Sequence, residues 1–389
     1  MTVLVCLLLT TVLCLLWSLT QPKRTAPLYH YANFTLITEL VHTNVTSVQT
    51  ENNSFSNNSG RYVHGCYNKG TIGTVQLLLN KSTLKTLGCK KRSPQVVIFG
   101  ARKSGTGTLR DFLSFHPQLA VADSEIHYLE YLSRTKAGST FYATKFRYGG
   151  RGNSIRIRGG EAYRDKFQPM KSLKTYTSLM PYSTPQQLVV EKTPKYFVCK
   201  NCPILLHKMI PDCKLIAILR DPVERAISGY AGFLQTHRTI KRLSPSLGME
   251  ETFEKTVIHD NGLVKRESPF IDIGIYKAHI KRWMSVFPKA QILLLDGGEF
   301  VKKPESILRQ VEKFLGIKAF FTSETFEYNK TKGFYCLKRP IKSCMGKRKG
   351  RKHPYVSPKV IKKLQQFYEP HNKEFSKFVN QKFSWTVYT

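Results

Sequence analysis

Apolar residues along this 389-residue chain fall into short runs that alternate with longer amphipathic stretches. Continuous runs rich in β-branched residues predict buried strands at 96–99, 188–190, 215–219 and 292–295. Apolar positions at helical spacing predict helices at 224–234, 275–287, 307–315 and 358–378. This alternation predicts an α/β domain with a central parallel sheet and helices on both faces, and with ligands at the carboxyl ends of the strands.

The first 19 residues contain no charged side chain and are dominated by Leu and Val. A segment of this length is typical of a signal peptide or a single membrane-spanning anchor, and either would direct the chain into the secretory pathway. Residues 20–93 have weak apolar periodicity and are predicted to form a glycosylated stem before a folded domain at 94–389. Sequons for N-glycosylation lie at Asn33, Asn44, Asn52, Asn57, Asn80 and Asn329.

The segment at 96–113 carries the most informative motif in the chain. A buried strand is followed by a loop with Gly105 and Gly107, and a helix is expected to begin near Thr106. Such a turn presents backbone N–H groups and a positive helix dipole to a phosphate. The loop is not a Walker A loop, because Lys103 stands inside it and the hydroxyl that would hold Mg²⁺ is out of register. It indicates an anionic nucleotide bound without a metal; an ordinary strand-to-helix turn is the alternative.

The charge of the chain narrows the choice of partner. Lys and Arg number 61 against 26 Asp and Glu, which gives a formal net charge of +35. So large an excess indicates a polyanion: nucleic acid, an anionic membrane or an acidic polysaccharide. Nucleic acid is scarce in the secretory pathway and sulfated glycans are abundant there, so we expect a sulfated polysaccharide and no nucleic acid.

Two of the nine cysteines, Cys6 and Cys14, lie in the N-terminal apolar segment, which leaves seven in an oxidising compartment. Because seven is odd, at least one thiol stays free or pairs between chains. The C-x-x-C pattern at 199–202 also suits a redox or zinc site, but no second such pair and no clustered His support that interpretation. The pairing is left open for Cys66, Cys89, Cys199, Cys202 and Cys213.

A second phosphate site is predicted where the strand at 215–219 ends. Arg220 leaves the strand end, and Ser228 lies two turns into the next helix. The planar Arg fork and the Ser hydroxyl suit phosphate oxygens, so the two loops together fit a nucleotide with phosphates at its 5′ and 3′ positions. With the run R-D-P-V-E-R-A-I-S-G-Y at 220–230, the chain resembles the sulfotransferases that use 3′-phosphoadenylyl sulfate.

Further motifs narrow the resemblance to the heparan sulfate glucosamine 3-O-sulfotransferases. They are S-E-I-H-Y at 124–128, V-E-K-T-P-K-Y-F at 190–197, L-D-G at 295–297, N-K-T-K-G-F-Y-C at 329–336 and K-G-R-K-H-P at 349–354. The resemblance covers about 94–385 and implies a P-loop-like single domain that sulfates the 3-hydroxyl of glucosamine in heparan sulfate or heparin. It also implies the Golgi lumen and, if the N-terminal segment is uncleaved, a single-pass type II membrane protein.

The resemblance assigns roles to individual residues. Glu125 would be the general base, Lys103 would neutralise the leaving phosphate, and Lys192 would hold both substrates near the reacting centre. His127, on a segment expected to be extended, would point the same way as Glu125 and orient the acceptor or the base. No metal is expected. The nucleotide would be bound by Lys103, Ser104, Gly105, Thr106, Gly107, Arg220, Ser228, Lys349, Gly350, Arg351, Lys352 and His353. A disulfide between Cys336 and Cys344 would position the basic segment 347–352 beside it.

The sequence departs from the family pattern at several positions. Glu130 replaces the usual Asp three residues after the His, Gly229 replaces an Asp, and Ala-Gly stands at 231–232 where Thr-Gln is expected. The family uses these positions on the acceptor side, so cofactor use is better supported than acceptor choice. A segment at 145–174 with nine Lys or Arg reads as an exposed basic insertion, either a polysaccharide contact or a solvated loop.

Three other functions are compatible with parts of this sequence. An N-sulfotransferase of the same polysaccharide would share the loop, the Cys pair and the basic segment. A catalytically silent heparin-binding protein on this scaffold would not need Lys103, Glu125 and Lys192. A P-loop kinase is disfavoured by the missing Mg²⁺ position. The preferred sulfation pattern and the oligomeric state are left open.

Overall fold

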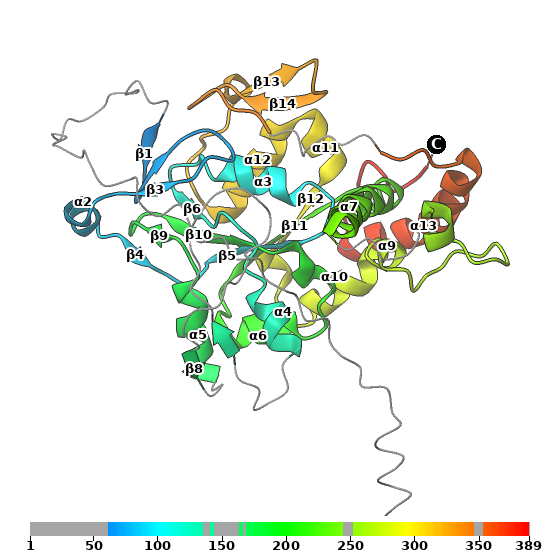
Figure 1. The fold of residues 1–389 in the computed structure, drawn as a ribbon, viewed down its shortest axis with the longest axis horizontal. Coiled ribbons are helices and arrows are strands. Elements are labelled where there is room, and N and C mark those ends of the chain that lie inside the picture. The colour runs from blue at the N-terminus through cyan, green and yellow to red at the C-terminus, as the bar shows by residue number, and fades with distance from the viewer. Residues whose placement is uncertain are drawn as a thin grey trace, which may run out of the picture. The chain divides into compact units, whose positions relative to one another are not determined.

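The computed structural model describes residues 61–134, 141–143, 163–165, 169–243, 252–345 and 353–388. These residues lie in one compact unit that spans Phe55–Thr389 (Figure 1). The expectations for residues 1–60, most of the basic insertion, and the segment 346–352 fall outside the described parts of the chain.

A five-stranded sheet forms the centre of this unit, in the order β12-β11-β5-β10-β6. Its strands are β5 (Val96–Gly100), β6 (Leu119–Val121), β10 (Leu188–Lys192), β11 (Lys214–Leu219) and β12 (Ile292–Asp296), and all neighbours pair in parallel. Four of the five are the predicted strands, whose continuous apolar runs reflect burial on both faces. The chain crosses from one side of β5 to the other between β10 and β11, so a ligand crevice is expected at the carboxyl ends of these strands.

Helices cover both faces of the sheet, as Figure 1 shows and as the sequence predicted. Val97 and Phe99 of β5 point into a core shared with α4 (Tyr128–Arg134), α5 (Pro169–Ser178), α6 (Cys202–Met209), α10 (Tyr276–Met284) and α13 (Pro358–Val379). Val96 and Ile98 point to the other face, into a core shared with α3 (Thr106–Leu113), α11 (Gly297–Lys302) and α12 (Pro304–Leu315). The α/β fold predicted from the alternating pattern is confirmed.

A third apolar cluster contains no residue of the central sheet and is built mostly by helices. Its residues come from α7 (Pro222–Leu243), α8 (Phe253–Val257), α9 (Pro269–Asp272) and the first half of α13. Short 3₁₀ turns complete the chain at η1 (Pro194–Val198), η2 (Lys289–Gln291) and η3 (Ser323–Thr325). Helix α7 is longer than predicted at both ends, because Pro222 suits its first turn and the apolar spacing understates its polar C-terminal half.

The predicted stem at 20–93 is wrong at its C-terminal end, because residues 61–93 belong to the compact unit. They form a small antiparallel sheet of β1 (Tyr62–His64), β2 (Tyr67–Lys69) and β3 (Leu77–Leu78), then α2 (Lys81–Thr86) and β4 (Lys90–Lys91). Strand β4 pairs with β9 (Tyr182–Ser183), and a disulfide joins Cys66 to Cys89. Strands this short carry too few apolar residues for a periodic signal.

The structure pairs six of the seven cysteines outside the N-terminal apolar segment, and one of these pairs was predicted. Cys336 in β14 (Phe334–Leu337) bonds Cys344, the predicted pair, and β14 pairs with β13 (Phe326–Asn329). Cys199 and Cys202 bond each other, so the C-x-x-C pattern is a disulfide here and holds no zinc. Buried Cys213 is the free thiol that the odd count requires.

The basic insertion is not wholly a loop. Strands β7 (Phe141–Ala143) and β8 (Tyr163–Asp165) pair antiparallel at its two sides, with Ala143 opposite Tyr163. The stretch 169–174 belongs to α5, whose later residue Tyr176 is completely buried. The prediction that 145–174 is one exposed segment is therefore corrected: within it, residues 145–162 and 166–168 lie outside the described structure, whereas 163–165 and 169–174 belong to β8 and α5.

Candidate active site

The predicted site residues come from four loops at one edge of the sheet. Lys103 follows β5, Glu125 and His127 follow β6, Lys192 ends β10, and Arg220 follows β11. Because neighbouring strands run parallel, the ends from which these loops leave lie side by side. The order of the strands thus brings together residues that are far apart in the sequence.

The loop after β5 has the backbone geometry of an anion cradle. Gly105 precedes α3 with a left-handed φ of 106°, and Lys103 also has a positive φ of 71°. Among the described residues no side chain caps the start of α3. The Ser104 hydroxyl is buried beside the Tyr276 hydroxyl and makes no hydrogen bond of regular geometry within the described parts. Uncapped N–H groups and a buried hydroxyl fit a bound phosphate group.

Charged side chains from three loops gather near this cradle. Arg220 binds Glu224 one turn further on, with its Nη2 at 2.7 Å from the carboxylate oxygen. Burial lowers the pKa of His353, and the positive charges of Arg220 and Lys103 lower it further. Arg220 and Lys103 therefore lie near enough to His353 for their charges to act on it, and a shared role in nucleotide binding stays a prediction. Ser228 is half-buried on α7, and Lys349, Gly350, Arg351 and Lys352 fall outside the described residues.

Glu125 stands between a lysine and a histidine. Its Oε1 lies 2.5 Å from Lys192 Nζ, and its Oε2 lies 3.3 Å from His127 Nε2. Burial raises the pKa of Glu125, but the hydrogen bond from His127 and the charge of Lys192 together outweigh it and hold the pKa at about 2. Lys192 itself is almost fully buried, with 5% of its side chain exposed. Glu125 is therefore ionised at neutral pH and contacts both Lys192 and His127.

The meeting of His127 and Glu125 has a different cause from the one predicted. The segment 124–127 is not a strand, and His127 has a left-handed φ of 58°. This turn, just before α4 begins, swings the imidazole back toward Glu125. The prediction of an extended segment is wrong, although the two side chains do meet.

Glu130 and Lys195 extend this cluster, although Glu130 was singled out only as a departure from the family pattern and Lys195 was assigned no role. Buried Glu130 accepts from His127 Nδ1 at 3.1 Å, and its other oxygen lies 2.5 Å from Lys195 Nζ. Hydrogen bonds to Glu125 and to Glu130 raise the pKa of His127 above its usual value. The result is a row of alternating charges, Lys192–Glu125–His127–Glu130–Lys195. The i, i+3 spacing of His127 and Glu130 was a signal for their contact; Lys195 stands in the motif at 190–197, but nothing in that motif indicated its pairing with Glu130.

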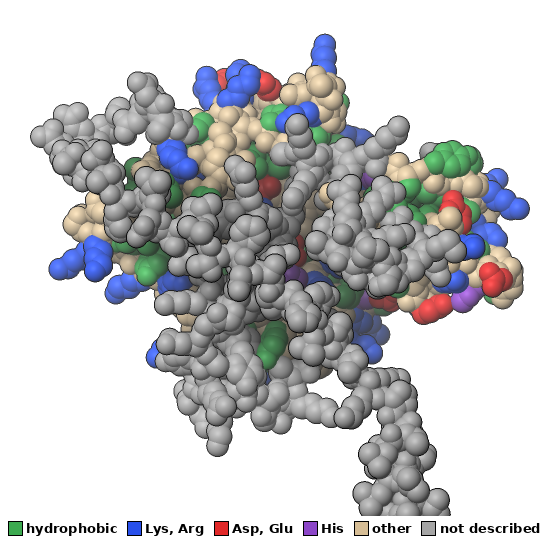
Figure 2. Space-filling view, in the orientation of Figure 1, with side chains coloured by type: hydrophobic (Ala, Val, Ile, Leu, Met, Phe, Trp, Pro, Cys, Tyr) green, Lys and Arg blue, Asp and Glu red, His purple; other side chains and the backbone are tan. Residues whose placement is uncertain are grey.

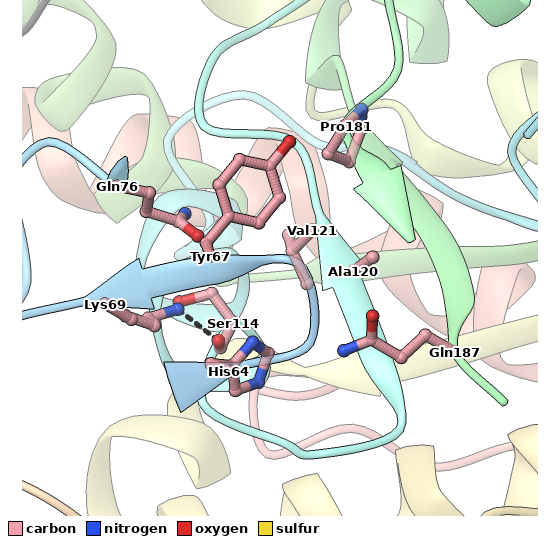
Figure 3. A pocket seen from close by; sticks show the side chains of 9 residues that line it. All are labelled: His64, Tyr67, Lys69, Gln76, Ser114, Ala120, Val121, Pro181 and Gln187. Atoms are coloured by element: carbon pink, nitrogen blue, oxygen red, sulfur yellow. Dashed lines mark hydrogen bonds between the residues drawn. The ribbon is translucent and has the colours of Figure 1, made fainter. Parts of the chain in front are cut away.

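A small pocket lies elsewhere in the molecule and contains none of the predicted site residues. Figure 3 shows His64, Tyr67 and Lys69 of the N-terminal sheet facing Ala120 and Val121 of β6 across it. Buried Lys69 donates to the carbonyl oxygen of Ser114, and burial lowers its pKa to about 7. This pocket marks the junction between the N-terminal strands and the central sheet.

No three His, Cys, Asp or Glu side chains gather as a possible metal site in the part of the chain that the structure describes. None of the helices described is long and apolar enough to cross a membrane, and the apolar segment 1–19 lies outside the described residues.

Comparison with known proteins agrees with this geometry. Residues 93–379 match the sulfotransferase domain family. The fold resembles a crystal structure of a sulfotransferase from Alicyclobacillus acidocaldarius, with a TM-score of 0.50 at 18% identity over 76% of this chain and 99% of that one. The parallel sheet, the cradle after β5 and the match over most of the chain define the protein as a sulfotransferase.

Two similar proteins define the family more closely. Heparan sulfate glucosamine 3-O-sulfotransferase 3A1 of Mus musculus is 33% identical over 80% of this chain and 68% of its own length. Heparan sulfate glucosamine 3-O-sulfotransferase 6 of Homo sapiens is 34% identical over 76% of this chain and 75% of its own length. The chain belongs to the heparan sulfate glucosamine 3-O-sulfotransferase family.

Proposed function

We propose that this protein transfers the sulfuryl group of 3′-phosphoadenylyl sulfate to the 3-hydroxyl of glucosamine residues in heparan sulfate. The observation that carries the proposal is the ionised Glu125, held between Lys192 and His127 at the sheet edge next to the phosphate cradle. The activity for which the relatives are named supports the choice of acceptor. The net charge of +35 suits a polyanionic acceptor. Figure 2 shows one side of the molecule, in the orientation of Figure 1, with Lys and Arg side chains spread over the described part of its surface.

Glu125 acts as the general base in this proposal. The sugar oxygen forms a bond to sulfur while the bond from sulfur to the leaving phosphate breaks, and Glu125 takes the hydroxyl proton. A carboxylate with a pKa of about 2 is a weak base toward an ordinary alcohol. The sugar hydroxyl becomes strongly acidic only as its oxygen bonds to sulfur. Glu125 therefore takes the proton in the transition state, while the bond to sulfur is forming. His127, which is braced by Glu130, fixes the direction of the carboxylate.

Cations stabilise the charge that moves to the leaving phosphate. Lys103 extends from the cradle, and Lys192 lies beside the base, so each is placed to neutralise negative charge at the reacting centre. Backbone groups of Ser104, Gly105, Thr106 and Gly107 hold the 5′ side of the donor, while Arg220, Ser228 and His353 hold its 3′ side. The segment 349–352 completes that grip. The donor supplies the activated sulfuryl group, and the residues in this set need no metal.

Incubation of the purified full-length protein with ³⁵S-labelled donor and defined heparan oligosaccharides tests the proposal. We expect label on the 3-hydroxyl of glucosamine, in EDTA as well as in Mg²⁺. Label on the amino group would instead establish the N-sulfotransferase alternative. High-affinity heparin binding without any transfer would establish the silent binding protein. A strict requirement for Mg²⁺ would contradict the metal-free site.

The location of the protein is part of the proposal. An N-terminal anchor or signal peptide at 1–19 would bring the enzyme to the Golgi lumen, where its polysaccharide acceptor is modified. Glycans are proposed on the sequons, of which two lie in the described residues. Asn80 is exposed and caps α2 through its Oδ1, and Asn329 is half-buried at the end of β13.

A further inference from the structure

A completely buried carboxylate lies directly behind the candidate active site. Glu191 precedes Lys192 in β10, and none of its surface is exposed. Tyr176 of α5 donates to its Oε2 at 2.9 Å, and the Thr193 hydroxyl donates to its Oε1. Tyr196 of η1 forms a further hydrogen bond to it. The mechanism above uses none of these groups.

Thr193 links this carboxylate to the loop that carries the base. Its Oγ1 accepts hydrogen bonds from the backbone N–H of Ile126 at 3.0 Å and of His127 at 3.2 Å. Backbone N–H groups can only donate, so both lone pairs of Oγ1 are used as acceptors. The single hydroxyl proton of Thr193 must then point at Glu191. The donors at Thr193 are therefore assigned: the two N–H groups donate to its Oγ1, and its own hydroxyl donates to Glu191.

We propose that Glu191, acting through Thr193, positions the backbone at 126–127 and thereby aims Glu125 and His127 at the acceptor. Glu191 and Thr193 are positioning residues, since neither lies among the groups assigned to the substrates. Loss of the Thr193 hydroxyl would leave the buried N–H of Ile126 and the part-buried N–H of His127 without their acceptor, at the turn that brings His127 back to Glu125. This inference rests on the proposed sulfuryl transfer for its kinetic arm only.

Protonation of Glu191 opposes this arrangement. A carboxylic acid proton on either oxygen competes with the Tyr176 or Thr193 donor. Burial raises the pKa of Glu191 to about 7, against hydrogen bonds from Thr193, Tyr176 and Tyr196 that lower it. The other ionisable groups that face it are His127 in the loop after β6 and the Cys213 thiol before β11. Transfer should therefore decline as pH falls through about 7, far above the pKa of Glu125.

Amide hydrogen exchange tests the positioning without any assumption about activity. In Thr193→Val, the amides of Ile126 and His127 should exchange roughly tenfold faster than in the wild type, because they lose their acceptor. Thr193→Ser keeps the hydroxyl and should restore slow exchange. Thr325→Val is the matched control: it also removes a buried Thr hydroxyl that accepts a backbone N–H, that of Thr322 at 2.9 Å in η3. Unchanged exchange at 126–127 in a folded Thr193→Val protein would overturn the proposal.

Kinetics form the second arm. Thr193→Val should lower kcat about tenfold or more with little change in donor affinity, Thr193→Ser should stay within about threefold of wild type, and Thr325→Val should keep full turnover. In Glu191→Gln, the decline of kcat below pH 7 should flatten, whereas a decline due to His127 would persist and contradict the role of Glu191. If the wild type transfers no sulfuryl group, the proposed function fails while the exchange result stands. If Thr193→Val does not fold, the exchange and pH profile of Glu191→Gln decide the proposal.

Discussion

Replacement of Glu125 by Gln tests whether this side chain acts as the general base or only fills its place in the site. Gln keeps the shape of the side chain and removes both its charge and its ability to take a proton. General base catalysis contributes about 10²–10⁴-fold to a reaction of this kind, so kcat should fall at least about 100-fold. Donor affinity should change little, because the cradle after β5 and the residues around Arg220 are untouched.

The same substitution should cost only modest stability. A folded pKa of about 2 in place of 4.5 corresponds to at most about 3 kcal/mol at neutral pH. With 36% of the Glu125 side chain exposed, solvent screening reduces this to about 1 kcal/mol. Because the folded pKa is lowered, this contribution is present above pH 4.5 and is lost as pH falls toward 2.

The assay is transfer of label from ³⁵S donor to a heparan oligosaccharide, with thermal unfolding measured in parallel. Glu299→Gln, a half-exposed carboxylate on α11 outside the site, is the control and should behave as wild type. A Glu125→Gln enzyme with turnover within about tenfold of wild type would refute the assignment of the base. A loss of turnover accompanied by unfolding at the assay temperature would refute the claim that the defect is chemical.

Three further predictions concern other parts of the chain. Lys103→Ala should lower kcat more than donor affinity, because its charge matters most as the phosphate leaves; equal losses in both would contradict this. Replacing 144–162 by a two-residue turn between the paired ends of β7 and β8 removes five Lys or Arg. The product should elute from heparin at lower salt with unchanged donor affinity, and identical elution would show that the segment does not contact the polysaccharide. Removing the disulfide by Cys66→Ala with Cys89→Ala should cost about 3 kcal/mol in denaturant unfolding, and an unchanged midpoint would show that burial alone orders residues 61–93.

Four of the five strands of the central sheet were predictable from the sequence. Four strands contain a continuous apolar run because both of their faces are covered, and that pattern is visible without any knowledge of neighbours. Strand β6 was missed because its three residues, L-A-V, are too few to stand out. The glycine loop after β5 and the R-D-P run after β11 could also be recognised from the sequence, because the residues of each motif are close together along the chain.

Tertiary structure alone decided how the site is assembled. Glu125 and Lys192 are 67 residues apart, and they meet because β6 and β10 are neighbours in the sheet. The positive φ of His127 and the pairing of Glu130 with Lys195 depend on packing around α4 and η1, which no local pattern encodes. The local sequence determines which side chains each loop carries. The order of the strands in the sheet determines which loops lie side by side, and therefore which charged side chains come within bonding distance.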